Sequence, residues 1–176
     1  MKSDDMPKMD AHLDLEARLD DFSAHDANGI AHSEHPQALR LWLRMLTCTQ
    51  LIEKRVRNEL RTQFDTTLPR FDLLSQLERS PQGLKMNVLS RRMMVTSGNI
   101  TGITDQLVGE GLVERVMVDG DRRAFRVRLT TLGRTQFAQM ALQHEKWIVE
   151  AFSVLNDADI TTLYQLLGNV KQHAVK

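Results

Sequence analysis

The sequence is poor in cysteine, in aromatic residues and in long apolar runs, and each shortage excludes something. Cys48 is the one cysteine among 176 residues, which rules out a disulfide within the chain and fits a reducing cytoplasm. Nothing approaches the roughly eighteen uninterrupted apolar residues of a membrane-spanning helix. The N-terminal segment is acidic and has no apolar signal core, so we expect no export. The 41% of hydrophobic residues still provide for one domain with a sizeable core.

The net charge of zero hides an uneven distribution of charge along the chain. Residues 1–36 contain three basic and nine acidic residues, a net charge of −6, so the rest of the chain carries +6. We interpret residues 1–33 as an acidic, flexible tail, although apolar residues at helical spacing leave a short helix open there. Residues 34–176 then form a single folded domain. Eight basic and five acidic residues between 85 and 128 give this domain a local excess of positive charge, which permits phosphate binding.

Apolar residues at helical spacing predict a series of helices in the first part of the folded region. The first runs from about 36 to 62, and its apolar stripe is so wide that a subunit contact would explain it. Thr67-Leu68-Pro69 is typical of a helix entry, and a short third helix passes through 86–93. Thr96 suits the N-cap of a fourth helix, and Gly111 suits the left-handed residue after its end.

After this fourth helix the spacing of apolar residues changes from helical to alternating. Val113–Val118 is rich in strand-forming residues, and Phe125–Leu129 alternates apolar with basic side chains. Asp119-Gly120-Asp121 between them is typical of a hairpin turn. The sequence therefore predicts a mainly α-helical fold with a small β-hairpin.

Two more helices are expected to close the chain, at about 131–154 and 157–172. Asn156 is a suitable N-cap for the second of them. The order over the central region is therefore helix, turn, helix and hairpin, with long helices on both sides of it in the sequence.

The fourth expected helix has a side that is polar and short-chained. Ser97, Asn99 and Thr101 occupy this side together with Gly98 and Gly102. Small side chains that can hydrogen-bond suit a close approach to base edges in the major groove of DNA. Each glycine costs about 1 kcal/mol relative to alanine inside a helix. Two of them on one side therefore indicate that the helix backbone has to lie close to another molecule or element. The alternative is that the glycines relieve crowding against a neighbouring helix.

Asp121, Arg122 and Arg123 fall at the tip of the predicted hairpin. An arginine at such a tip can enter a DNA minor groove, where the narrow walls concentrate negative potential. A neighbouring aspartate can hold the guanidinium in position. Taken alone, the tip could equally be a solvated turn with a local ion pair. Because the tip follows a predicted helix–turn–helix, we favour contact with DNA.

These residues belong to a run, VTSGNITGITDQLVGEGLVERVMVDGDRRAFRVRLTTLGR, that resembles the winged helix–turn–helix core of the MarR family of transcriptional regulators. The similarity covers the recognition-helix pattern and the wing pattern D-x-R followed by L-T-x-x-G. The order of the helices agrees from about 36 to 172. The resemblance implies a DNA-binding winged helix at about 66–130. It also implies an obligate homodimer built by the helices at about 36–62 and 131–172.

The resemblance further implies how such a dimer meets DNA. Recognition helices enter successive major grooves of a palindromic operator about one helical turn apart, and each wing presents an arginine to a minor groove. By position, Arg123 is that arginine and Asp121 orients it. Many relatives have arginine where Ser97 and Gly102 stand, so direct guanine readout either is weaker or comes from Asn99 and nearby arginines. The remaining implied DNA-binding residues are Arg91 and Arg92 for phosphates, Ser97 and Thr101 for bases, and Arg122 in the wing.

Regulators of this family usually release DNA when a small molecule binds, which requires unequal affinity for two conformations. The phrase LPRFDLLSQL, together with VTSGNITGITDQL, resembles a subgroup that senses aromatic acids or their coenzyme A thioesters. This resemblance implies a repressor of aromatic-compound catabolism genes that needs no cofactor. Its effector would meet Arg40, Trp42, Arg44 and Arg70. The alternative places Trp42 in a dimer core and the arginines in solvent or in ion pairs.

Several other functions are weighed against this one. Cys48 leaves open a redox switch in a regulator of stress or efflux genes, but no second cysteine can resolve a sulfenate, and we expect a buried thiol. His25, His32 and His35 have no carboxylate or cysteine at metal-ligand spacing, so no metal site is predicted. Neither a nucleophile–base pair nor a phosphate-binding glycine loop occurs, so no enzyme is expected. A winged-helix adaptor between proteins is the alternative outside DNA binding.

Overall fold

The computed structural model of the chain describes residues 36–118 and 121–174. It divides into two compact units, Met1–Arg55 and Val56–Lys176. The flexible tail expected at residues 1–33, and the short helix left open there, lie outside the described residues. Within the described ranges, none of the helices combines the length and the hydropathy that a bilayer crossing requires.

The helix α2, Pro36–Phe64, confirms the long helix that the sequence predicts from about 36. In the first unit, Leu43 and Thr47 stand one turn apart and are 7% and 6% exposed. Cys48 is exposed, so the expectation of a buried thiol is wrong. Each residue turns by about 100° around a helix, and this rotation carries Cys48 away from the buried side on which Thr47 lies.

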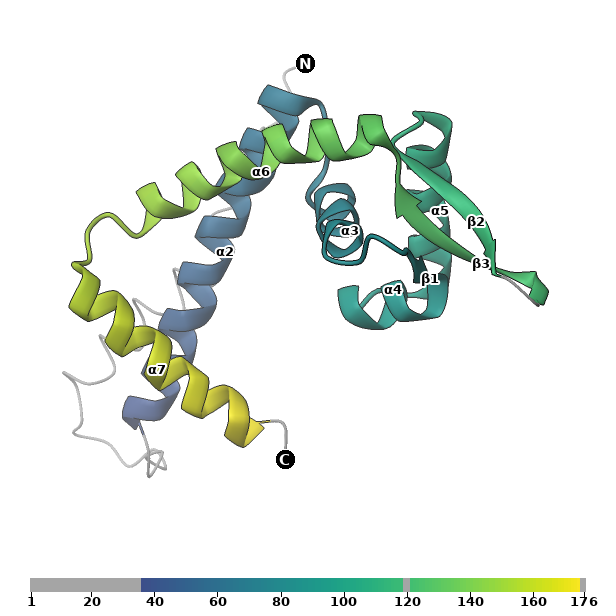
Figure 1. The fold of residues 1–176 in the computed structure, drawn as a ribbon. Coiled ribbons are helices and arrows are strands. Elements are labelled where there is room, and N and C mark those ends of the chain that lie inside the picture. The colour runs from purple at the N-terminus through teal and green to yellow at the C-terminus, as the bar shows by residue number, and fades with distance from the viewer. Residues whose placement is uncertain (1–35, 119–120, 175–176) are drawn as a thin grey trace, which may run out of the picture. The chain divides into compact units, whose positions relative to one another are not determined.

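The second unit contains the winged helix–turn–helix order that the sequence predicts (Figure 1). The helix α3, Leu68–Glu78, lies between α6, Thr131–Ala151, and α4, Met86–Met93, and α5, Ser97–Gly109, packs on α4. Fully burying one leucine contributes about 1.5–3 kcal/mol, so the shared core fixes α5 firmly from one side. The core side chains that are 1% exposed or less include Leu60, Leu73, Leu74, Leu77, Leu89, Ile100 and Leu107.

The helix α5 begins and ends where its capping residues predict. Thr96 is the N-cap, and its Oγ1 accepts a hydrogen bond from the backbone N–H of Asn99 at 3.4 Å. Gly111 follows the helix with φ of +72°, the left-handed conformation that favours glycine. Met94 ends α4 in the same conformation, with φ of +54°. These two reversals set the direction of α5 relative to α4 and to the sheet.

The sheet in the described region has three antiparallel strands in the order β1-β3-β2, one strand more than the predicted hairpin. The additional strand β1, Leu84–Lys85, pairs with the central strand β3, Asp121–Leu129, and β2 is Val113–Val118. Gly83 allows this pairing, because its φ is +79° and an added Cβ would lie 2.7 Å from the carbonyl oxygen of Val127. A strand of two residues is too short to show an alternating apolar pattern, so β1 could not be predicted from the sequence.

The strand β3 also begins earlier than the predicted start at Phe125. Asp121, expected in the turn, lies in β3 and pairs with Val118 of β2. A register shift between Met117 and Val118 accommodates the pairing near the tip. The reversal at residues 119–120 lies outside the described residues.

The helices α6 and α7, Asp157–Ala174, close the chain and confirm the last two predicted helices. Thr130 is the N-cap of α6 and accepts from the backbone N–H of Gly133 at 3.0 Å. A Cβ at Gly133 would lie 1.9 Å from the carbonyl oxygen of Leu112, so only glycine permits this approach. Asn156 Oδ1 accepts a backbone N–H of the first turn of α7 at 3.0 Å, as its predicted cap role requires.

Candidate nucleic-acid interface

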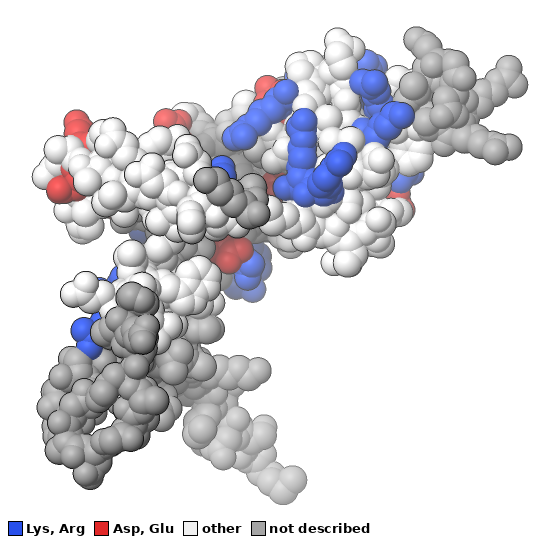
Figure 2. Space-filling view, turned by 90° about the horizontal axis from the view of Figure 1, so that it is seen from below, with Lys and Arg blue, Asp and Glu red and all other residues white. Residues whose placement is uncertain are grey.

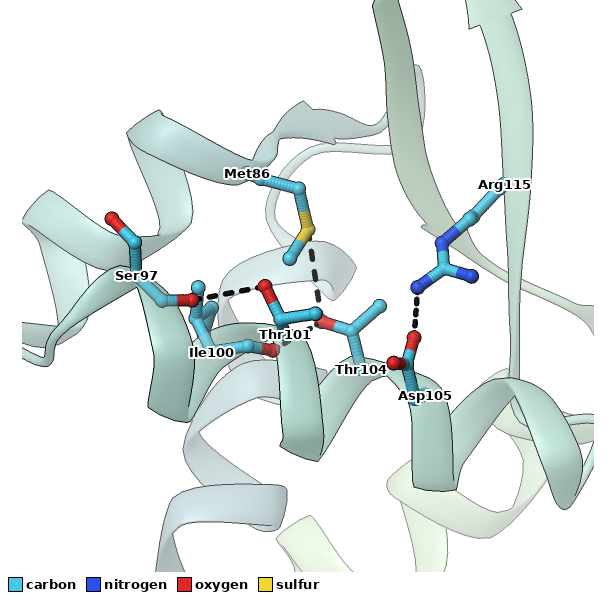
Figure 3. A network of polar contacts seen from close by, with 7 residues as sticks. All are labelled: Met86, Ser97, Ile100, Thr101, Thr104, Asp105 and Arg115. Atoms are coloured by element: carbon cyan, nitrogen blue, oxygen red, sulfur yellow. Dashed lines mark hydrogen bonds and ion pairs between the residues drawn. The ribbon is translucent and has the colours of Figure 1, made fainter.

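The outward side of α5 carries the short polar side chains that the sequence singled out. Ser97, Asn99 and Thr101 are all exposed. Thr101 Oγ1 donates to the backbone carbonyl of Ser97 at 2.9 Å (Figure 3). Its proton is therefore used within the helix, and its oxygen remains able to accept from a base amino group.

Gly98 and Gly102 leave this outward side without bulk. Apart from the nearby backbone of α5 itself and the adjacent residues, no heavy atom of the described residues lies within 4 Å of a Cβ added at either position. The alternative that these glycines relieve crowding against a neighbouring helix is therefore wrong. They leave a place where the α5 backbone can approach an external surface closely.

The opposite side of α5 is held by the core. Thr104 is fully buried, and its Oγ1 donates to the carbonyl of Ile100 at 2.7 Å and lies 3.8 Å from Met86 Sδ of α4 (Figure 3). Because the buried side is fixed on α4, the polar side is held in one orientation toward solvent.

An ion pair links α5 to the wing formed by β2 and β3. Arg115 on β2 donates to Asp105 Oδ1 on α5 (Figure 3). The Arg115 guanidinium carbon also lies 5.2 Å from the centroid of the Phe125 ring on β3. Sequence reasoning matched both charged residues to the family pattern but missed that they pair. The contacts position the wing relative to α5.

Basic side chains gather on the face of the winged-helix elements that Figure 2 shows. Arg91 and Arg92 occupy the last turn of α4 and are exposed, as phosphate contacts require. Arg92 Nη1 donates to Ser80 Oγ at 3.5 Å. Lys85 and Arg126 are exposed as well, and sequence reasoning gave neither of them a role. Their opposite positions on β1 and β3 could be found only once β1 was known.

The wing residues Asp121, Arg122 and Arg123 lie at the start of β3. Their side chains are outside the described part of the structure. Their expected role at a minor groove therefore stays a prediction.

The four residues expected to meet an effector are divided between the two units. Arg40, Trp42 and Arg44 lie on α2 in the first unit, and the Trp42 side chain is 56% exposed. Arg70 lies on α3 in the second unit and pairs with Glu110 at the end of α5. Its Nε is buried and has no hydrogen-bond partner in the described residues.

An aromatic cluster that sequence reasoning did not identify joins α3 to α6. The His144 ring centroid lies 4.8 Å from that of Phe71 and 6.4 Å from that of Trp147, and Phe71 lies 5.5 Å from Phe137. Burial lowers the pKa of His144 below its ordinary value of 6.5. The ring is therefore neutral at neutral pH and packs as an aromatic side chain. In the described ranges, no group of three His, Cys, Asp or Glu residues is placed to hold a metal ion.

Comparison with known proteins places this geometry among transcriptional regulators. Residues 64–124 match a family model described as MarR family. An uncharacterized HTH-type transcriptional regulator of Bacillus cereus is 30% identical over 138 residues, which cover 77% of this chain and 90% of that protein. AbsC, a MarR family transcriptional regulator from Streptomyces coelicolor, has a similar fold, with a TM-score of 0.70 at 21% identity over 83% of this chain and 98% of that one. A mutant of MarR from E. coli, complexed with operator DNA, gives a TM-score of 0.66 at 26% identity over 79% and 99% of the two chains.

Proposed function

The chain belongs to the MarR family of transcriptional regulators, and on this premise we propose that it binds a palindromic DNA operator as a homodimer. Each subunit inserts α5 into a major groove and its wing into the adjacent minor groove. The observation that carries the proposal is the outward side of α5, which consists of short polar side chains and open glycines while its other side is anchored in the core. The E. coli relative complexed with operator DNA supports the same use of the fold.

The contacts divide into those that read bases and those that hold the backbone. Asn99 is the side chain best suited to adenine, because an amide can pair with the N6 and N7 groups together. Thr101 offers its hydroxyl oxygen and its methyl group one turn after Ser97. Arg91 and Arg92 meet phosphates, which position the protein without reading sequence. Ser97 faces bases at the start of α5.

The wing completes the contact at the minor groove. Arg123 enters the groove, Asp121 orients its guanidinium, and Arg122 meets the neighbouring backbone. The ion pair of Asp105 with Arg115 ties this wing to α5, so both elements approach the duplex as one body.

The homodimer is supported by an uncovered apolar stripe on α7. No residue of this helix is buried, although its apolar residues follow helical spacing. Such a helix is stable when an apolar partner covers the stripe, and a second copy provides one by symmetry. The α7 stripe consists of Ile160, Leu163, Tyr164, Leu167 and Val170, which are 37–80% exposed.

An effector of the aromatic-acid class, free or as a coenzyme A thioester, is the ligand that we propose for release from DNA. It relieves repression of genes for aromatic-compound catabolism. The exposed Trp42 offers a ring face, and Arg40, two residues earlier, offers a charge on another side of α2. Arg44 follows on the same helix, and we restrict the proposed effector site to α2, because Arg70 belongs to the second unit and pairs with Glu110. A melting temperature that moves with neither aromatic acids nor their thioesters would remove this effector class.

The DNA contact is tested by in vitro selection from a random-sequence duplex pool, followed by titration of the selected duplex. We expect a two-fold symmetric sequence, with an affinity that falls steeply as salt rises. Arg123→Ala should weaken DNA binding and leave the dimer intact. Arg134→Ala, at an exposed position on α6, is the matched control and should change neither the DNA affinity nor the dimer. A sequence-blind interaction that ignores salt would favour the protein adaptor instead.

A further inference from the structure

Two basic side chains stand directly opposite each other on the outer face of the sheet. The register of β1 and β3 pairs Lys85 with Arg126, and both are exposed. Side chains of directly opposed residues project from the same face of an antiparallel pair, with Cβ atoms about 5 Å apart. The two cations are therefore neighbours by construction of the sheet.

Two other arginines of this sheet, among those whose side chains the structure describes, are neutralised by carboxylates. Arg128 pairs across the strands with Glu114 at 2.7 Å, and Arg115 pairs with Asp105. Arg126 has Lys85 on one side and Val116 on the other. Within the described ranges, neither Lys85 nor Arg126 forms an ion pair with a carboxylate. Among the basic residues of the sheet whose side chains are described, Lys85 and Arg126 therefore differ from Arg115 and Arg128.

Like charges directly opposite each other destabilise a sheet, so their presence calls for a reason. A lysine on an edge strand discourages edge-to-edge association of sheets, and this reason covers Lys85 on β1. It does not cover Arg126, because β3 is the central strand. An external anion that binds both side chains removes the repulsion and accounts for both.

We propose that Lys85 and Arg126 form a phosphate-binding pair, which holds the DNA backbone outside the segments that contact bases. The inference rests on the proposed function, and it adds a contact that neither α5 nor the wing tip makes. Lys85 directly precedes α4, the helix whose last turn carries Arg91 and Arg92, and basic side chains gather on this region in Figure 2. Guanidinium suits bidentate contact with phosphate oxygens, and the lysine ammonium adds a point charge.

The test compares salt titrations of DNA binding for Lys85→Gln/Arg126→Gln and for the wild-type chain. The probes are a duplex selected by the wild-type chain and a scrambled duplex of equal length. Each phosphate contact contributes about 0.9 to the log–log slope, so the variant slope should be shallower by about 0.9–1.8 per subunit. Binding to both probes should weaken by about eight- to sixtyfold per bound subunit at 100 mM salt, because phosphate contacts are indifferent to sequence.

A matched control removes the same kinds of charge elsewhere. Arg134→Gln/Lys146→Gln takes one arginine and one lysine from exposed positions on α6 and should leave the slope unchanged. The Lys85→Gln/Arg126→Gln variant should melt no lower than the wild type, since it relieves a repulsion, so loss of folding does not confound the result.

The outcomes separate this inference from the proposed function. A wild-type chain that binds neither probe defeats the proposed function. If the wild-type slope is steep and the Lys85→Gln/Arg126→Gln variant retains it, the contact of this pair with the DNA backbone is refuted and the proposed function stands. The remaining experiment measures the thermal shift that inorganic pyrophosphate induces at constant ionic strength. If the variant loses a pyrophosphate-induced thermal shift and keeps the DNA slope, the pair serves a free phosphate compound and the assignment to DNA is overturned.

Discussion

The α7 stripe allows the proposed homodimer to be tested with a magnitude taken from the structure. Leu163 and Leu167 lie one turn apart and are 38% and 37% exposed. Full burial of a leucine contributes about 1.5–3 kcal/mol, so covering what remains exposed contributes roughly 0.6–1.2 kcal/mol for each side chain. Two leucines in each of two subunits contribute about 2–5 kcal/mol. Leu163→Ala/Leu167→Ala should therefore weaken the dimer by about 30- to 3,000-fold.

Sedimentation equilibrium over a dilution series measures this change directly. The wild-type chain should sediment at twice its chain mass of 20.2 kDa, and the variant should dissociate at much higher concentration. Alanine has the highest helix propensity, so circular dichroism should show that α7 persists. Loss of the dimer should also reduce affinity for a palindromic duplex more than affinity for a single half-site.

The matched control uses the polar side of the same helix. Gln165→Ala/Asn169→Ala replaces two exposed residues on the side opposite the α7 stripe and should leave the dimer unchanged. Equal dissociation constants for the two double variants would refute the stripe as the subunit contact.

Three other substitutions test the contacts within the second unit. Gly133→Ala places a Cβ 1.9 Å from the Leu112 carbonyl oxygen. This overpacking should lower the free energy of unfolding, measured by urea titration, by about 1–3 kcal/mol. An unchanged urea midpoint would contradict the close approach. Burial lowers the pKa of His144, so the unfolded chain binds its proton first and stability should fall as pH drops below 6.5. His144→Phe should reduce the difference in stability between pH 7.5 and pH 5.5, and a variant with the full difference would exclude this histidine. Asp105→Asn should lower the free energy of unfolding by less than about 1 kcal/mol, because its ion pair with Arg115 is partly exposed. The substitution should nevertheless weaken DNA binding. Unaltered DNA affinity would show that this ion pair does not position the wing.

Local chemistry made most helix boundaries predictable. Thr96 and Asn156 cap the helices that follow them, because their side-chain oxygens accept free backbone N–H groups within the next turn. Gly111 marks the end of α5, because its left-handed conformation is strained for other residues. These signals depend on neighbours in the chain, so a sequence displays them directly.

Contacts between distant parts of the chain were harder to predict. The strand β1 has two residues, and its pairing with β3 follows from the path of the chain through Gly83. The pairing of Asp105 with Arg115 depends on how α5 packs against β2. The exposure of Cys48 depends on which side of α2 is covered, and a stripe as wide as that of α2 does not define one side. The opposition of two cations across β1 and β3 follows only from the register.

The central claim is that two α5 helices and two wings bind one duplex together, and a hydroxyl-radical footprint on the selected operator tests it most directly. We expect two protected half-sites related by two-fold symmetry, with centres about 10 base pairs apart. Protection of a single half-site at saturating protein, or no protection at all, would contradict the claim.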